Sequence, residues 1–164
     1  MKKTYFTCLL IAAVFSSCAQ VKCSINKAYA YFTVSIPGAQ MVDEKGNPVP
    51  PIPQVERFIY LEGKGVNKPV IESVYYNNTM FTVVLTKVEG NNISAGKRTE
   101  DGKEVTIKAR NGNALWKLEL QPSADKPQDP SAAKNISIRL KTAGKLCTYK
   151  ISGGELQLAT EPRY

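Results

Sequence analysis

The chain contains no histidine among its 164 residues. This absence removes the commonest general base and metal ligand, and with it serine or cysteine triads of the usual kind and zinc hydrolase motifs. The sequence also lacks a GxSxG nucleophile elbow, a phosphate-binding glycine loop and a dinucleotide-binding fingerprint. The adjacent acids Asp43-Glu44 and Glu100-Asp101 lie in turn-rich segments, where carboxylates are usually solvated. We therefore expect a protein that is not an enzyme and that needs no cofactor.

Apolar runs are short at the N-terminus. Lys2 and Lys3 precede an apolar stretch of 11 residues, Tyr5 to Phe15, whereas a membrane-spanning helix needs about 20. Small residues and a cysteine follow, which completes the three-part pattern of an export signal. The segment Phe15-Ser16-Ser17-Cys18 resembles the lipobox of bacterial lipoproteins in its Ser-Ser-Cys form, which is similar to that of the Bacteroidetes group, although Leu is usual at the position of Phe15.

The resemblance implies that residues 1–17 are a helical signal peptide and that Cys18 receives the lipid, such as palmitate. Two or more acyl chains hold a protein firmly on a membrane without a transmembrane helix. Ala19 is not the aspartate that retains some lipoproteins in the inner membrane, and no acidic export tag follows it. We expect a lipid anchor in the outer membrane, with the domain facing the periplasm. The alternative is an ordinary signal cut after Ala19, which would release a soluble periplasmic protein.

Only two cysteines are expected to remain available for a disulfide after this processing. Of the four cysteines, Cys8 leaves with the signal and Cys18 is taken by lipid, so that Cys23 and Cys147 remain. In the oxidising periplasm these two can form a disulfide bridge. The chain-entropy model gives about 4 to 5 kcal/mol as an upper guide to its contribution to the free energy of unfolding. The alternative is a buried Cys147 and a free thiol at Cys23. No CxxC spacing is present, and we expect no metal site.

The charge is mildly basic. The 22 Lys and Arg against 14 Asp and Glu give +8, which becomes +6 when Lys2 and Lys3 leave with the signal. The basic residues are spread along the chain, which favours a solvated surface over a dedicated site for anionic lipid or an anionic glycan. No basic run or aromatic RNA-binding motif indicates nucleic acid as a partner.

No segment after the signal shows a helical period, and short alternating runs dominate. These runs and the turns between them predict eight or nine strands in one domain, residues 28–164, behind a lipidated tether of residues 18–27. We expect an all-β fold, a two-sheet β-sandwich of immunoglobulin-like architecture, with a barrel as the alternative. The expected strands are residues 28–36, 55–62, 70–76, 79–88, 104–109, 114–121, 136–141, 146–152 and 155–160.

Turn chemistry predicts how some of these strands connect. Asn77-Asn78 predicts a tight hairpin, and Asn111-Gly112 is the dipeptide best suited to a two-residue hairpin turn between residues 104–109 and 114–121. The last three strands are expected to form a meander. The Pro-rich segment that ends at Pro53 is interpreted as a stiff connector, with a docking loop for a partner as the functional alternative.

Aromatic side chains supply the candidate binding residues. Tyr75, Tyr76 and Phe81 flank the Asn77-Asn78 turn and predict either a surface for a sugar or protein partner or a structural cross-strand cluster. Trp116 shares its face with Leu118 and Leu120 and is expected in the core. The favoured function is a membrane-tethered, non-enzymatic accessory lipoprotein that binds an envelope protein. The alternative is a carbohydrate- or peptidoglycan-binding lipoprotein that uses the tyrosines and exposed lysines.

Overall fold

The computed structural model describes residues 23–38, 41–65, 67–121 and 129–160. The expected signal peptide, Cys8 and the expected lipid acceptor Cys18 lie outside these residues. Every regular element in the described ranges is a β-strand, so the all-β class is confirmed. Within the same ranges, no helix has the length and apolar character needed to cross a membrane.

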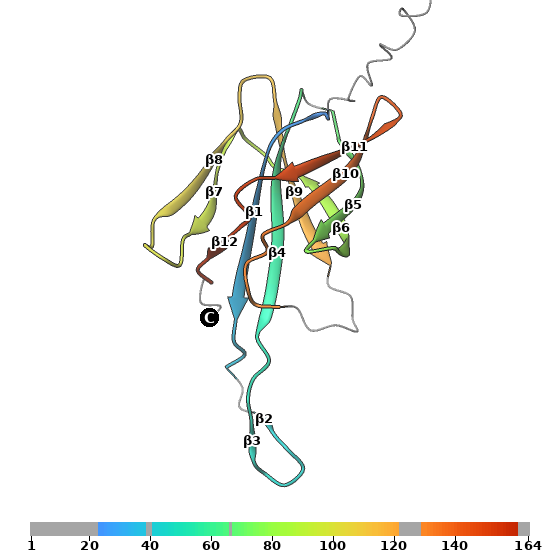
Figure 1. Ribbon diagram of the computed structural model, residues 1–164. Helices are drawn as coiled ribbons and strands as arrows, with labels where there is room; N and C mark the ends of the chain where they lie inside the picture. The colour runs from blue at the N-terminus through green and yellow to red at the C-terminus, as the bar shows by residue number, and fades with distance from the viewer. Residues whose placement is uncertain (1–22, 39–40, 66, 122–128, 161–164) are drawn as a thin grey trace, which may run out of the picture.

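Eight strands form one continuous sheet that curls into a half-barrel (Figure 1), so the main strands are not divided into two sheets. The strand order is β11-β10-β5-β6-β9-β4-β1-β12. The bounds are β1 Ile25–Ser35, β4 Gln54–Gly63, β5 Val70–Tyr76, β6 Thr79–Lys87, β9 Ala114–Gln121, β10 Ile136–Thr142, β11 Lys145–Ile151 and β12 Glu155–Leu158. Two further hairpins form separate two-stranded sheets. One consists of β2 (Met41–Val42) and β3 (Pro48–Val49), and the other of β7 (Asn92–Lys97) and β8 (Glu104–Lys108).

Apolar side chains are buried on both faces of the curled sheet. The larger cluster includes Ile59, Trp116 and Ile138 and draws on strands from β1 to β11, which places it inside the half-barrel. The smaller cluster lies on the outer face, where Ile107 of β8 packs with Tyr31 and other residues of the sheet. The β7–β8 hairpin therefore forms a second layer over β1, β4 and β9, and Trp116 is a core residue as expected.

The Asn77-Asn78 hairpin is confirmed, with Tyr76 opposite Thr79 and φ angles of 45° and 71° at the two asparagines. The hairpin expected at Asn111-Gly112 is wrong. A turn is present, because the N–H of Asn113 donates to the carbonyl of Arg110 (3.0 Å), but β8 pairs with β7 while β9 pairs with β4 and β6. The primed turns of two-residue hairpins need positive φ at the first central residue (type II′) or at both (type I′), and here only the second central residue, Gly112, has it.

The expected C-terminal meander is also wrong in its last strand. β10 and β11 form the hairpin, but β12 crosses to the other edge and pairs with β1 in parallel. Glycine permits this crossing, since Gly154 has a φ of 73° and a Cβ there would lie 3.0 Å from the carbonyl oxygen of Ala133. The strand β7 lies between the expected strands 79–88 and 104–109, where the sequence predicts no strand.

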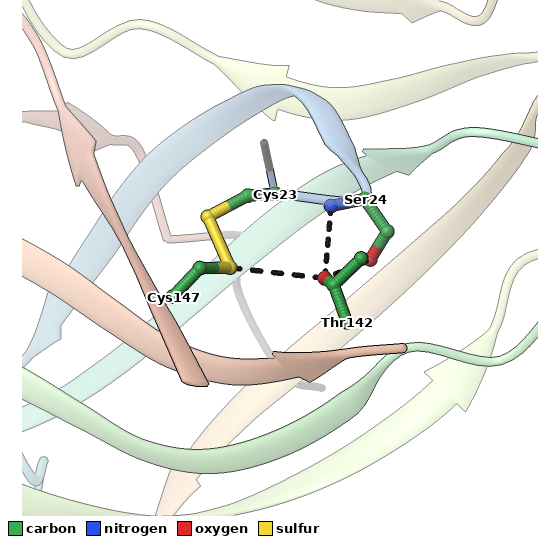
Figure 2. The surroundings of a disulfide bond; sticks show 4 residues. All are labelled: Cys23, Ser24, Thr142 and Cys147. Atoms are coloured by element: carbon green, nitrogen blue, oxygen red, sulfur yellow. Dashed lines mark hydrogen bonds between the residues drawn. A yellow bond between two sulfur atoms is a disulfide. The ribbon is translucent and has the colours of Figure 1, made fainter. Parts of the chain in front are cut away.

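A disulfide between Cys23 and Cys147 joins the start of β1 to β11, with the two Cα atoms 5.8 Å apart (Figure 2). The N–H of Ser24 donates to Thr142 Oγ1 (3.2 Å), and the same hydroxyl lies 3.7 Å from Cys147 Sγ. β1 begins at Ile25, so the last residues of the expected tether belong to the strand. The disulfide therefore holds the two sides of the half-barrel together at the end where the chain enters the domain.

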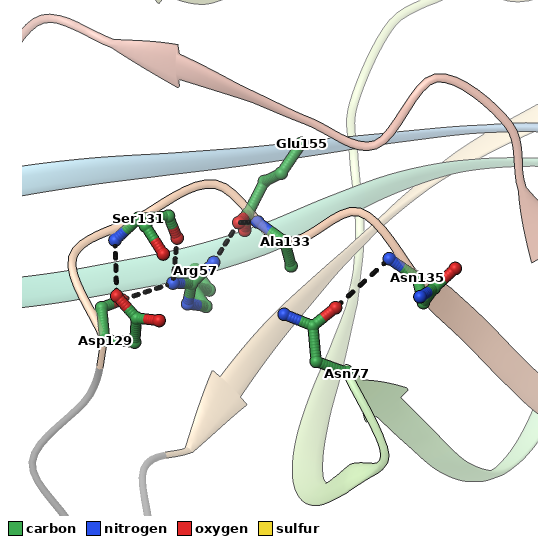
Figure 3. A network of polar contacts seen from close by, with 7 residues as sticks. All are labelled: Arg57, Asn77, Asp129, Ser131, Ala133, Asn135 and Glu155. Atoms are coloured by element: carbon green, nitrogen blue, oxygen red, sulfur yellow. Dashed lines mark hydrogen bonds and ion pairs between the residues drawn. The ribbon is translucent and has the colours of Figure 1, made fainter.

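At the opposite end of the half-barrel, a buried ion pair joins Arg57 of β4 to Glu155 of β12 (Figure 3). The guanidinium also donates to the carbonyls of Asp129 (2.6 Å) and Ser131 (2.9 Å), and the N–H of Ala133 donates to Glu155 (3.1 Å). Burial lowers the pKa of Arg57, but an arginine remains charged in proteins. Because the rings of Phe32 and Tyr76 lie 5.2 and 5.4 Å from the guanidinium, this charge is enclosed by aromatic faces as well as by hydrogen-bond acceptors.

Removing the disulfide is expected to destabilise the domain. It joins residues 124 apart in the sequence, and chain entropy predicts a loss of up to about 5 kcal/mol in the free energy of unfolding. The Cys23→Ser/Cys147→Ser variant should therefore unfold at a lower urea concentration than the oxidised protein. Chemical reduction of the native protein is the matched control, and equal midpoints for the oxidised and reduced forms would contradict a stabilising bridge.

Replacing one partner of the Arg57–Glu155 pair should lower the free energy of unfolding more than replacing both partners. Arg57→Met leaves the Glu155 carboxylate buried without its partner, which is expected to cost about 3–5 kcal/mol. The double variant Arg57→Met/Glu155→Leu leaves no uncompensated charge and should recover much of that loss. Urea denaturation of the two variants gives the comparison, and a double variant less stable than the single one would show that the pair itself contributes the stability.

Candidate functional site

The three aromatic residues expected to form a binding cluster do not share one surface. Tyr76 is only 4% exposed and its ring packs edge-on against Phe81 inside the half-barrel, with the ring centroids 5.6 Å apart. Tyr75 precedes Tyr76 in β5, and successive side chains of a strand point to opposite faces of the sheet. Two of the three residues are thus part of the core, and a stacking platform for a sugar cannot include Tyr76.

Tyr75 remains on the outer side, paired with Met80 on β6 and Ser137 on β10. Hydrogen bonds to Ser73 and to Arg139 lower the pKa of its phenol. Met80 beside it is exposed. Tyr75 and Met80 therefore form a cross-strand contact on the outer side of the sheet, and the Tyr75 hydroxyl is its polar group.

A projecting arm, defined as residues 36–38 and 41–53, carries the most exposed apolar side chains of the described residues. It leaves the ends of β1 and β4, and its tip is the β2–β3 hairpin, at the bottom of Figure 1. Four large apolar residues of this arm are solvent-exposed: Ile36 (68%), Val42 (62%), Val49 (38%) and Ile52 (71%). Only eight large apolar residues are this exposed in the described part of the chain, so the arm holds half of them. Such an exposed apolar group is typical of a contact surface.

The tip of the arm is ordered by one carboxylate. Asp43 Oδ1 accepts the N–H groups of Lys45 and Asn47, both at 2.8 Å, and Oδ2 accepts the side-chain amide of Asn47 (3.0 Å). The hydrogen bonds from Asn47 lower the pKa of Asp43. These contacts are those of an Asx-type turn, which presents the flanking strands in one conformation. The Asp43-Glu44 pair is thus turn chemistry, as the sequence indicates.

A groove of about 910 Å³ lies at the base of the arm. It runs between the arm, the end of β12 and the β7–β8 layer, and it has polar walls with an apolar patch. Its lining includes Thr33, Gln54, Glu56, Ser94, Ile36 and Leu158. The arm and the groove are adjacent, so together they form a candidate contact surface, named the arm site here. The arm contains the Pro-rich segment for which the sequence offers a stiff connector or a docking loop, and the docking alternative stays a prediction.

The disulfide end of the domain contains a second organised polar centre. The buried side chain of Glu62 accepts hydrogen bonds from the N–H of Arg110 (3.2 Å) and from the side-chain amide of Asn113. Burial raises the pKa of Glu62, but the hydrogen bonds from Asn113, Arg110 and Asn26 outweigh it, so the pKa lies below its usual value. Glu62 therefore fixes the turn between β8 and β9 while ionised.

Neither end gathers a set of ligands for a metal, since the described residues contain no group of three or more His, Cys, Asp or Glu in position to hold an ion. Comparison of the chain with protein-family models, with curated proteins and with solved structures finds no significant match. The case for a function therefore depends on the surfaces themselves.

The ionised Glu62 should make stability depend on pH on the acid side. Its pKa is lower in the folded protein than in the unfolded chain, so its contribution is complete above the unfolded pKa and is lost as the pH falls through the folded pKa. Glu62→Gln should cost about 1–3 kcal/mol at neutral pH and flatten the decline of stability in acid. Urea midpoints measured across the acid range test this. A variant whose decline parallels that of the native protein would assign the acid sensitivity to other groups.

Proposed function

We propose that the protein is a membrane-tethered, non-enzymatic accessory lipoprotein of the bacterial cell envelope, which holds an envelope protein through its arm site. The observation that carries this proposal is the position of the arm. The chain enters the domain beside the Cys23–Cys147 disulfide, and the arm projects from the opposite end (Figure 1). A lipid on Cys18 would thus leave the arm site facing away from the outer-membrane surface and toward the periplasm.

The chemistry of the arm favours a protein partner over a small molecule. Exposed aliphatic side chains such as Ile52 stabilise a complex only when another apolar surface covers them. The prolines and the Asx-type turn restrict the arm before binding, which reduces the entropy lost when a partner orders it. In this proposal, the curled sheet and the β7–β8 layer over it form a two-layer, immunoglobulin-like support that holds the arm.

Site-specific photo-crosslinking in intact cells tests the arm site. A photoreactive amino acid at Val42 or Ile52 should give a discrete adduct with one envelope protein, whereas the same residue at Val84, exposed on β6, should not. Adducts at Val84 equal to those at the arm, or none at the arm, would contradict the proposal.

The Cys18→Ser variant is the control for the tether in this experiment. It should lose labelling by a fatty-acid probe, and its arm adduct should weaken because the domain is no longer held beside its partner. Retained fatty-acid labelling in this variant would show that Cys18 is not the lipid acceptor.

A further inference from the structure

The excess positive charge of the described residues lies at one end of the domain. The segments at the disulfide end are residues 23–27, 62–72 without residue 66, 87–91, 108–115 and 141–147 (top of Figure 1). They contain eight Lys and Arg against three Asp and Glu, a net charge of +5. The remaining described residues hold nine basic and nine acidic side chains, which cancel. The fold thus collects residues that are far apart in the sequence into a basic face, defined by these five segments.

Hydrogen bonds between the loops hold the basic face in one arrangement. The N–H of Lys64 donates to the carbonyl of Ser24 (2.8 Å), and the N–H of Ala114 donates to that of Gly65 (3.0 Å). The N–H of Val88 donates to the carbonyl of Leu115 (3.0 Å). Together with the disulfide and Glu62, these contacts join all five segments. The charges are therefore presented on a preorganised surface rather than on independent loops.

The side chains of this face are available to a partner. Lys27, Lys64, Lys68, Lys87 and Lys145 are exposed and form no ion pair with another described residue, whereas Lys141 is paired with Glu72. Exposed apolar residues stand beside two of them, Val70 (57%) near Lys68 and Leu146 (50%) next to Lys145. A cleft of about 390 Å³, lined by apolar residues that include Ile71, Val83 and Leu85, opens between β5 and β6 at the same end. Lysines around small apolar projections are the composition of a surface that lies on lipid headgroups.

We propose that the basic face docks on an anionic phospholipid surface, with the lysines at the headgroup phosphates and Val70 and Leu146 at the interface. The inference rests on the proposed lipid anchor for its geometry. Cys18 is five residues before Cys23, and five extended residues span at most about 18 Å, or two Debye lengths at physiological salt. One lipid-anchored cysteine and one basic surface supply the two signals that stable membrane attachment requires. Docking would also orient the arm away from the bilayer.

Differential lysine labelling tests this docking on the mature, lipid-modified protein in vesicles. One set of vesicles contains phosphatidylglycerol with phosphatidylethanolamine, and the other contains phosphatidylcholine alone. On the anionic vesicles at about 0.05 M salt, an amine reagent should modify Lys64, Lys68, Lys87 and Lys145 about threefold or more slowly than on the neutral ones, and about 0.5 M salt should abolish the difference. Lys45, Lys97 and Lys150 lie outside the basic face and should react equally in both. Equal rates for the two groups of lysines would overturn the proposal.

Two charge-matched variants separate position from net charge. Lys64→Glu/Lys68→Glu/Lys87→Glu should remove the protection of Lys145, while Lys45→Glu/Lys97→Glu/Lys150→Glu changes the net charge equally and should leave that protection intact. Equal loss in both variants would show that overall charge is responsible and would overturn the proposal. Protection of the same lysines by soluble heparin but not by the anionic vesicles would assign the basic face to an acidic glycan and would also overturn the proposal.

Vesicle flotation at about 0.5 M salt distinguishes failure of this inference from failure of the proposed anchor. Protein that floats with vesicles of either composition is held by its lipid. Protein that is released at high salt but protected on anionic vesicles at low salt has a functional basic face without the anchor at Cys18. Protein that floats but shows no selective protection has the anchor, and its basic face does not dock.

Discussion

The buried Arg57–Glu155 pair is the constraint that the end of the chain must satisfy, because either charge alone would be buried without its partner. It joins a central strand to the last strand of the sheet, and its guanidinium holds the carbonyls of the segment that precedes β10. β12 crosses to the far edge and lies parallel to β1, although the preceding hairpin offers a nearer antiparallel edge. At the far edge Glu155 gains a buried partner in Arg57, and Leu158 is buried in the outer cluster. β12 in turn receives the end of β7, through the bridge between Arg98 and Leu158 and the hydrogen bond from Ala159 to Lys97. The outer layer is therefore attached to the same strand that the ion pair holds.

This pair and the disulfide act at opposite ends of the same half-barrel. The disulfide and Glu62 order the loops where the chain enters, and the ion pair orders the chain near the base of the arm. A curled sheet that is secured at both ends can present different chemistry at each of them. The entry end presents lysines around small apolar side chains, and the far end presents an apolar arm with a polar groove at its base. The proposed functions follow this division, with lipid at one end and protein at the other.

Local pattern predicted much of the secondary structure but little of the pairing. Alternation located β1, β4, β10 and β11 to within a few residues, and the positive φ angles at Asn77 and Asn78 are those that asparagine tolerates in a tight hairpin. β7 was missed because its residues Asn92 to Lys97 are mostly polar and gain order only from the outer cluster. The Asn111-Gly112 prediction failed for a related reason. β9 buries both Leu115 and Trp116, on opposite faces, so it belongs at the centre of the sheet and not beside β8.

For the candidate surfaces, too, the sequence predicts the character of single segments, whereas the tertiary structure decides which segments lie together. From the order of its residues alone, the chain is assigned to the all-β class, and its apolar and charged positions are visible, because alternation and composition are properties of neighbouring residues. Which side chains meet is decided by contacts between residues far apart in sequence, and these depend on how the whole sheet curls. Lysines that are dispersed from Lys27 to Lys145 in the chain become one basic face only when the loops are joined, and Tyr76 becomes a core residue only when β5 turns its side chain inward.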